Sequence, residues 1–148
     1  MDNIDKQLIR LLQENARSTI SVLSNKVGLS MPAVSERVKR LEQNGIIKQF
    51  TALLNPDLID KQLVALVHIG FENPKYMPDF IDFTKSEPDI LECFKTSGHY
   101  EFTLKFQTKN TDTLENLLNR IKSIQGVNKT HSIVVLSTVI DRPSVTVD

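Results

Sequence analysis

The side chains whose order suggests a chemical role lie in one segment, Ser30–Asn44. Its apolar residues Val34, Val38 and Leu41 repeat at the spacing of one helical face. The opposite face begins with small or polar residues and carries its cations later. That order suits a helix whose N-terminal end enters the major groove of DNA, with small groups near the bases and cations beside phosphates. The candidate DNA-contacting residues are Ser30, Met31, Pro32, Ser35, Glu36, Arg37, Lys39 and Arg40.

Two earlier helices are predicted to position this segment. Asn3–Asn15 has apolar residues on one helical stripe. A second, shorter helix is expected to begin after Thr19 and to end at Gly28, a residue that readily takes the left-handed conformation of a helix end. Ser30 is a suitable N-cap for the third helix. A helix, a three-residue turn with a glycine and another helix form a helix-turn-helix. A solvated helix face with pairs such as Glu36–Arg40 is the alternative interpretation.

Charge is divided unevenly along the chain. The 148 residues contain 18 Lys or Arg and 18 Asp or Glu, which leaves no net formal charge. Residues 1–50 hold eight of the bases and five of the acids, a net charge of +3, and the remainder carries −3. This division indicates two modules with different partners, although the excess is smaller than most DNA-binding domains carry.

A strand is predicted directly after the third helix, at Ile46–Leu54, where it would be a wing or a link to the next module. Asn55-Pro56 ends it as a turn signal. The predicted division is a DNA-binding domain at 1–50, a linker at 51–62, a second domain at 63–141 and a tail at 142–148.

The rest of the chain predicts the element order β-α-β-β-α-β. The expected segments are strand Leu63–Glu72, helix Lys75–Ser86, strands Ile90–Thr96 and Tyr100–Thr108, a helix from a capping box at Asp112 and Glu115 to Gly126, and strand Val127–Ile140. This order is typical of a ferredoxin-like sandwich, in which two helices cover one face of a four-stranded sheet. The predicted fold class is therefore α+β, with a helix-turn-helix before the sandwich.

The first and last predicted strands are apolar on both faces, although two helices can cover only one face of the sheet. Strands of this kind are normally buried on both sides. We therefore expect the uncovered face to meet a second copy of the chain. A homodimer would also suit a DNA-binding protein that must read two half-sites.

Motifs for catalysis, phosphate binding and metal binding are absent. His68, His99 and His131 are scattered, and a single cysteine, Cys93, cannot form an internal disulfide. No apolar run has the length of a membrane span, and the N-terminus does not resemble a signal peptide. The sequence therefore predicts a cytoplasmic protein without enzymatic activity, metal, cofactor or membrane partner.

Several segments combine motif, order and spacing. They are Asp2–Asp5 with Leu8–Leu12, Asn15–Arg17, Val27–Ser30 with Val34–Glu42, Gly45–Ile47, Phe50–Pro56, and Gly126-Val127. Together these segments resemble the Lrp/AsnC (feast/famine) family of bacterial and archaeal transcription regulators, and the resemblance spans residues 2–141. It implies a winged helix-turn-helix, a hinge, and a regulatory sandwich that dimerises and assembles further into octamers.

The resemblance also implies an amino-acid effector, bound near the loop between the second and third sheet strands. The candidate effector-binding residues are Ser97, Gly98, His99, Tyr100 and Glu101. Gly98 matches the usual Gly-Asp-x-Asp loop, His99 replaces its first acid, Tyr100 fills the variable position and Glu101 stands for its second acid. A histidine offers no fixed negative charge to an ammonium group at neutral pH, so the sequence leaves open whether an effector binds.

A second function stays open beside DNA binding. A sequence pI of about 6.8 also suits a regulatory subunit that senses an amino acid and acts through protein contacts. Binding to genomic DNA at physiological salt would separate these two functions.

Overall fold

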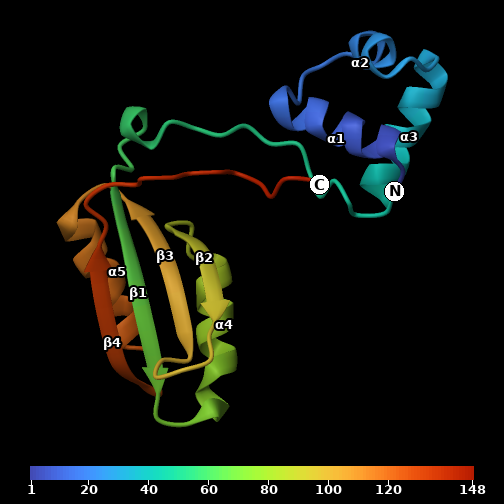
Figure 1. Cartoon of the computed structure of the whole chain (residues 1–148). Helices are drawn as coiled ribbons and strands as arrows, with labels where there is room; N and C mark the ends of the chain where they lie inside the picture. The colour runs from blue at the N-terminus through green and yellow to red at the C-terminus, as the bar shows by residue number, and fades with distance from the viewer. The chain divides into compact units, whose positions relative to one another are not determined.

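The chain divides into two units in the computed structural model, which describes residues 1–148. The first unit is Met1–Leu53 together with Ile140–Asp148, and the second is Leu54–Val139. Figure 1 shows helices in the first unit and a sheet with helices in the second. The α+β fold class predicted from the sequence is confirmed. None of the helices combines the length and apolar character that a membrane span requires.

Polar side chains begin each helix of the first unit. The helices are α1, Asn3–Glu14; α2, Ile20–Val27; and α3, Met31–Gln43. Asp2 accepts a hydrogen bond from the Asp5 amide, and the Asp5 carboxylate accepts one from the Asp2 amide. Thr19 caps α2 and Ser30 caps α3, as predicted. Such caps typically stabilise a helix by about 0.5–2 kcal/mol each.

The turn between α2 and α3 depends on Gly28. Its φ angle is 71°, in the left-handed region, and its amide donates to the Ser24 carbonyl that α2 leaves unpaired. A side chain at this φ would be strained, whereas glycine adopts it freely. The predicted three-residue connection of a helix-turn-helix is therefore confirmed.

The core of the first unit draws on all three helices. Leu8 of α1, Leu23 of α2 and Val34 of α3 are buried against one another, with Leu12 beside them. Seven partly buried apolar residues surround these four: Ile4, Leu11, Ile20, Val27, Leu29, Val38 and Ile47. The predicted apolar stripes therefore face inward.

The strand predicted at Ile46–Leu54 is wrong. These residues form no strand, and Phe50, Leu53 and Leu54 are exposed. An isolated strand leaves its backbone groups unpaired, and no other strand of the chain pairs with this segment. The helix-turn-helix of this structure therefore has no wing.

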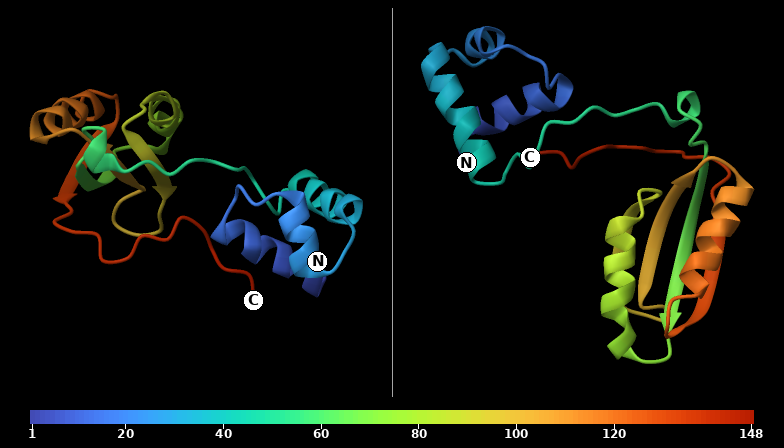
Figure 2. Two further views of the ribbon diagram at one scale, coloured as in Figure 1. Left: turned by 90° about the horizontal axis from the view of Figure 1, so that it is seen from above. Right: turned by 180° about the vertical axis from the view of Figure 1, so that it is seen from behind.

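A four-stranded antiparallel sheet forms the centre of the second unit. Its elements are β1, Leu63–Phe71; α4, Met77–Ser86; β2, Ile90–Lys95; β3, Phe102–Thr108; α5, Thr111–Lys122; and β4, Val127–Val134. The strands lie in the order β2-β3-β1-β4. Both helices lie on one face of the sheet, as the left view of Figure 2 shows. This arrangement is the ferredoxin-like sandwich that the sequence predicted.

Both ends of α5 and the end of β4 were predicted wrongly. The cap of α5 is Asn110 with Thr113, not the expected box at Asp112 and Glu115, and the helix ends at Lys122 rather than Gly126. Strand β4 ends at Val134 instead of Ile140.

The early end of β4 follows from its neighbour. The Val135 amide still donates to the Val64 carbonyl, but β1 begins at Leu63, so later residues have no strand to pair with. The predicted helix from Lys75 also starts differently, because one turn of 3-10 helix, Pro74–Tyr76, precedes α4.

The core of the second unit lies between the sheet and its two helices. Phe80 of α4 packs 5.2 Å from Phe71 and 5.1 Å from Phe102, measured between ring centroids. Ile121 and Leu117 of α5 are also buried there.

Gly126 makes the close approach of β4 to the 3-10 turn possible. Its φ is +86°, and a Cβ atom at this position would lie 2.2 Å from Cδ2 of Tyr76. Only a residue without a side chain fits here.

The other face of the sheet has no helix over it. Leu66 of β1 pairs with Ile133 of β4, and the next residue on the same face, His68, pairs with His131. Ile133 is 44% exposed, and Phe94 of β2 is 52% exposed. The sequence-based expectation that helices cover only one face is confirmed.

Candidate nucleic-acid interface and ligand loop

One face of α3 is open to solvent and carries many of the predicted DNA-contacting residues. Five of them are exposed there: Met31, Pro32, Ser35, Glu36 and Lys39. Met31 is 51% exposed although it is apolar. Lys39 makes no ion pair within the chain, so its charge is available to a partner.

The N-terminus of α3 is capped by Ser30 and has no acidic side chain in its first turn. The Ser30 hydroxyl accepts a hydrogen bond of 3.4 Å from the Ala33 amide, and Pro32 stands in the first turn. The helix dipole places partial positive charge at this end, where phosphate oxygens bind favourably. No acidic side chain in the first turn competes for that place.

The two arginines of α3 point toward the start of α1. Nη1 of Arg37 lies 2.7 Å from Oδ2 of Asp2 and 2.7 Å from Oδ1 of Asp5. Nη2 of Arg40 lies 3.3 Å from Oδ2 of Asp5. The side chain of Arg37 is 24% exposed and that of Arg40 is 52% exposed, so Arg40 has more room for an outside partner.

These contacts change the acidity of both carboxyl groups. For Asp5, burial opposes ionisation, but hydrogen bonds from Arg37 and from the Asp2 amide outweigh it and hold its pKa below the ordinary value. For Asp2, the hydrogen bond from the Asp5 amide and then that from Arg37 lower the pKa. Both groups raise the pKa of Arg37 in return.

Sequence reasoning did not identify Asp2 and Asp5 as partners of α3. The spacing Asp2-x-x-Asp5 is a local signal for a capping box, which the structure contains. No local signal places that box beside Arg37, because the contact joins residues 32 and 35 positions apart.

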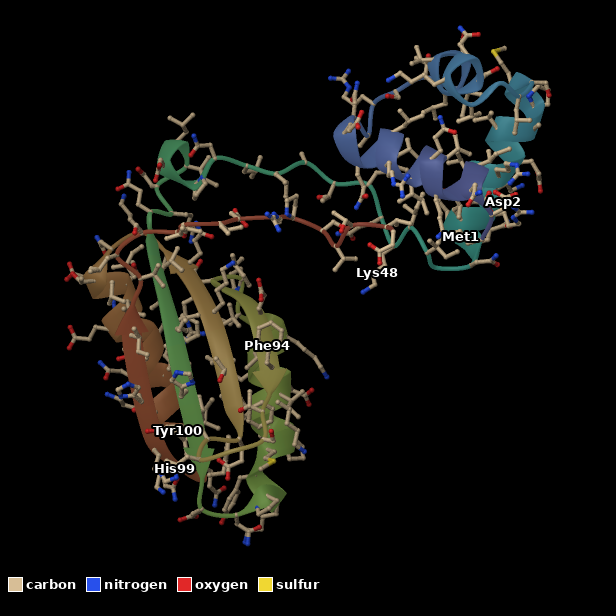
Figure 3. All side chains as sticks on the ribbon, viewed as in Figure 1. Met1, Asp2, Lys48, Phe94, His99 and Tyr100 are labelled. Carbon is tan, nitrogen blue, oxygen red and sulfur yellow. The ribbon has the colours of Figure 1, made fainter.

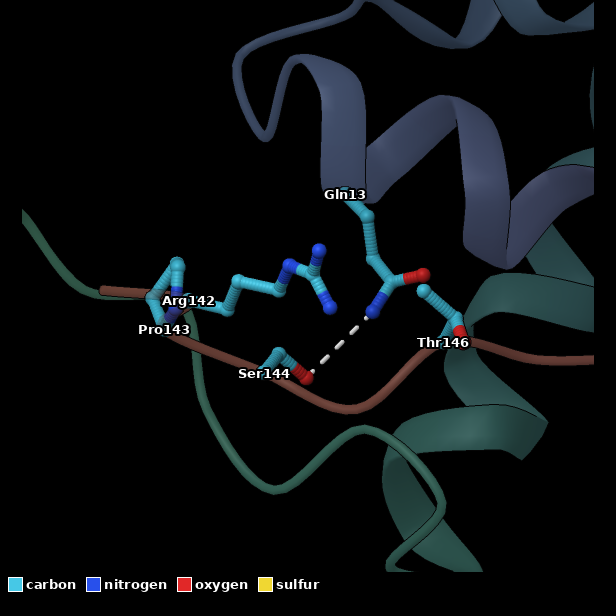
Figure 4. A pocket seen from close by; sticks show the side chains of 5 residues that line it. All are labelled: Gln13, Arg142, Pro143, Ser144 and Thr146. Carbon is cyan, nitrogen blue, oxygen red and sulfur yellow. Dashed lines mark hydrogen bonds between the residues drawn. The ribbon is translucent and has the colours of Figure 1, made fainter. Parts of the chain in front are cut away.

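The C-terminal tail lies on α1 within the first unit. Nε and Nη2 of Arg10 each donate to the Val147 carbonyl at 3.2 Å. Gln13 donates to the Val145 carbonyl at 2.6 Å and to the Ser144 hydroxyl at 3.3 Å, the contact drawn in Figure 4. The shallow pocket shown there is lined by Gln13, Arg142, Pro143, Ser144 and Thr146.

The predicted effector loop, Ser97–Glu101, joins β2 to β3 and is closed by Thr96. The Thr96 amide donates to the Glu101 carbonyl and its hydroxyl to the Tyr100 carbonyl, both at 2.8 Å. Gly98 has a φ of +146°, with open space where a Cβ would stand. Figure 3 labels His99 and Tyr100 on this loop.

The loop brings Tyr100 to the uncovered face of the sheet. Its ring centroid lies 5.6 Å from that of His68 and 6.4 Å from that of His131. Nδ1 of His68 is bonded to the Thr103 hydroxyl at 2.9 Å, so this histidine already has a structural partner. No three His, Cys, Asp or Glu side chains gather as metal ligands.

Glu101 has a structural role beside its predicted one. Its Oε2 accepts a hydrogen bond of 3.0 Å from the Phe71 amide, at the irregularity where the pairing of β1 with β4 shifts register. This leaves Oε1 of Glu101 as the carboxylate oxygen with no partner in the chain.

Two family models match different parts of the chain. Residues 1–42 match the AsnC-type helix-turn-helix domain, and residues 64–145 match the Lrp/AsnC ligand binding domain. The second match alone spans more than half of the chain.

Curated relatives match nearly the full length. The HTH-type transcriptional regulator FL11 of Pyrococcus furiosus is 36% identical over 136 residues, which covers 92% of this chain and 89% of the relative. The leucine-responsive regulatory protein of Escherichia coli is 34% identical over 142 residues, covering 94% and 87%.

Solved structures show the same fold. A transcriptional regulator from Neisseria meningitidis, solved as a complex with L-Met, superimposes with a TM-score of 0.92 at 28% identity and covers 98% of this chain and 96% of that one. Escherichia coli AsnC superimposes with a TM-score of 0.90 at 26% identity, with 96% of each chain covered.

Proposed function

The chain belongs to the Lrp/AsnC family of transcription regulators, and from this premise we propose that it binds a specific sequence of double-stranded DNA with α3. The observation that carries the proposal is the solvent-open face of α3. This face begins at a capped N-terminus with small residues. Further along the helix it carries Lys39, which has no ion-pair partner within the chain. Such a helix fits the major groove end-first.

Seven of the eight predicted contact residues have a place in this proposal, and the eighth, Arg37, is paired with Asp2 and Asp5. Met31, Pro32, Ser35 and Glu36 face the base edges, where small and polar groups set the local fit. Lys39 and Arg40 lie further along the helix and neutralise phosphates. Ser30 presents the N-terminal amides of α3 to a phosphate while it caps the helix.

A charge reversal on α3 tests the DNA proposal. Lys39→Glu places a carboxylate among phosphates and is expected to abolish binding to genomic DNA fragments in gel-shift titrations at physiological salt. The matched control is Lys122→Glu, a reversal at an exposed lysine of α5 in the second unit. Equal loss in both variants, or no loss in Lys39→Glu, would contradict this assignment of α3.

We also propose that the second unit pairs two copies of the chain through the uncovered face of its sheet. Leu66, Phe94 and Ile133 bring apolar surface to this face, and sheets normally bury such faces. Two copies would present two α3 helices to successive major grooves, about 34–36 Å apart. Further assembly of these dimers to octamers is the extension that the family resemblance implied.

Mass measurement tests the assembly. A dimer or a multiple of it is expected at micromolar concentration, and Leu66→Asp, which places a carboxylate on the proposed interface, should shift the mass to that of one chain. An exposed substitution away from this face, Glu115→Ala on α5, should leave the mass unchanged. A monomeric unmodified chain would contradict the proposal.

An amino acid is the proposed effector, with the loop Ser97–Glu101 as its site. The support is the Lrp/AsnC ligand binding domain model and the L-Met complex of the Neisseria regulator. Within the loop, Gly98 leaves open space, and Oε1 of Glu101 can face an ammonium group. Calorimetry with each of the twenty amino acids tests this, and no heat from any of them would remove the effector from the account.

A further inference from the structure

A cluster of ion pairs joins the start of α1 to α3. It contains four side chains: Asp2, Asp5, Arg37 and Arg40. Asp5 is its centre, because it alone is bonded both to Arg37 and to Arg40. Asp2 joins it through the capping box at the start of α1.

Asp5 is a buried carboxylate. The residue is 3% exposed, and both of its oxygens are occupied. Oδ1 accepts from Arg37 at 2.7 Å, and Oδ2 accepts from the Asp2 amide at 3.1 Å and from Arg40 at 3.3 Å. A charge removed from water to this degree persists only when it is paired and hydrogen-bonded.

We propose that Asp5 and Arg37 are positioning residues: they fix α3 against α1 in the orientation that reads DNA, and Arg37 does not itself bind phosphate. This inference rests on the proposed function and deepens it. Arg37 reaches back from α3 to Asp2, the N-cap of α1, and to Asp5 in its first turn, and its planar guanidinium holds both at once. The rotation of α3 about its own axis is thereby tied to α1.

The alternative is that Arg37 releases Asp5 and turns to a phosphate when DNA arrives. Release would leave the buried Asp5 carboxylate with Arg40 as its remaining cation, at 3.3 Å. Losing the partner of a buried charge is strongly unfavourable. Lys39 sits on the same helix, exposed and unpaired, and can meet a phosphate without that loss.

The test compares the unmodified chain with Asp5→Asn, Arg37→Gln and the double variant. Binding to a selected operator and to a non-specific duplex of equal length is titrated over a range of salt concentrations. We expect each single variant to lower the ratio of specific to non-specific affinity by about tenfold or more. The ratio should fall no further in the double variant than in the worse single variant, because both substitutions remove the same contact between Asp5 and Arg37.

Non-specific binding gives the readout that separates positioning from direct contact. A phosphate contact contributes about 0.9 to the slope of log affinity against log salt. We expect Arg37→Gln to leave this slope unchanged on the non-specific duplex. A decrease of about 0.9, together with unchanged or tighter operator binding by Asp5→Asn, would overturn the proposal.

Loss of stability is controlled separately. Leu12→Ala removes a core side chain from the far end of α1 without touching the cluster. Its specific-to-non-specific ratio should stay near that of the unmodified chain when measured below its unfolding temperature. An equal fall of the ratio in Leu12→Ala would overturn the positioning role. If Arg37→Gln does not fold, Asp5→Asn decides alone, because it keeps the guanidinium and leaves Asp2 as its only carboxylate partner.

Failure of the proposed function has a different signature. An unmodified chain that binds no DNA would contradict DNA recognition by α3, and the positioning role with it. Binding by the unmodified chain with a direct-contact signature for Arg37 would contradict only the positioning role.

Discussion

Nη1 of Arg37 lies 2.7 Å from Oδ1 of Asp5, so a cation of the proposed DNA-reading helix is bonded to a buried acid of the first helix. The amino-acid pattern places Arg37 on the flank of α3 and suggests a phosphate contact. The structure gives its guanidinium two carboxylate partners within the same unit. The sequence pattern therefore predicts which residues of α3 are exposed better than it predicts the partners of Arg37.

The same contact predicts how stability depends on pH. The pKa of folded Asp5 lies below its ordinary value of 3.8. Ionised Asp5 therefore stabilises the folded unit at neutral pH, and this contribution is lost as the pH falls below about 4 through the folded pKa. Asp5→Asn should be less stable than the unmodified chain at pH 7, and the difference should shrink toward pH 3. Thermal unfolding followed by circular dichroism measures both.

The control for this pH dependence is Glu14→Gln. Glu14 is exposed at the end of the same helix and has no ion-pair partner. At each pH, the unfolding temperature of Glu14→Gln should be nearly the same as that of the unmodified chain. A stability difference for Asp5→Asn that stays constant between pH 7 and pH 3 would contradict the role given to the ionised carboxylate.

Lys39→Ala tests the charge on the open face of α3. Because Lys39 has no intramolecular partner, we expect weaker binding to all DNA sequences and a salt slope smaller by about 0.9. Stability should change by no more than about 0.5 kcal/mol, as for other surface substitutions. Lys122→Ala is the matched control, and an identical slope in the unmodified chain and Lys39→Ala would count against the assignment.

Glu101→Ala is predicted to destabilise the second unit whether or not an amino acid is present. The substitution leaves the amide of buried Phe71 without its 3.0 Å acceptor, and an unsatisfied buried donor costs about 1–3 kcal/mol. Urea unfolding measures the change. Glu92→Ala on an exposed part of β2 serves as the comparison, and equal stability of the two variants would show that the Glu101 contact is dispensable.

Gly126→Ala should be more disruptive than Gly28→Ala. Both glycines have positive φ, which costs a side chain about 1–3 kcal/mol. Only at Gly126 would the added Cβ also meet a neighbour, 2.2 Å from Cδ2 of Tyr76, whereas Gly28 faces open space. Unfolding free energies of the two variants test this, and a smaller loss for Gly126→Ala would argue against the close approach.

Much of the fold follows from local patterns that the sequence displays. Thr19, Gly28 and Ser30 set the ends of α2 and the start of α3 through their own backbone preferences. The order of strands and helices after Leu63 identifies the sandwich. These features depend on neighbours within a few residues, so periodicity and capping rules suffice to predict them.

The errors arise where distant residues decide. The segment Ile46–Leu54 has the composition of a strand but no strand beside it, and β4 ends where β1 offers no further partner. The cap of α5 is an exception, because Asn110 and Thr113 form it within four residues, two positions before the spacing of Asp112 and Glu115 that the sequence suggested. At the candidate site, the hydrogen bond from the Phe71 amide to the Glu101 carboxylate could not be foreseen from a loop motif.

Selection of genomic DNA fragments by the unmodified chain at physiological salt, with and without amino acids, tests the central claim most directly. The account predicts recurrent enrichment of fragments that share a pseudo-palindromic site, with half-sites about 10 base pairs apart or a multiple of that spacing. Fragments recovered no more often than with a non-binding control protein would contradict it.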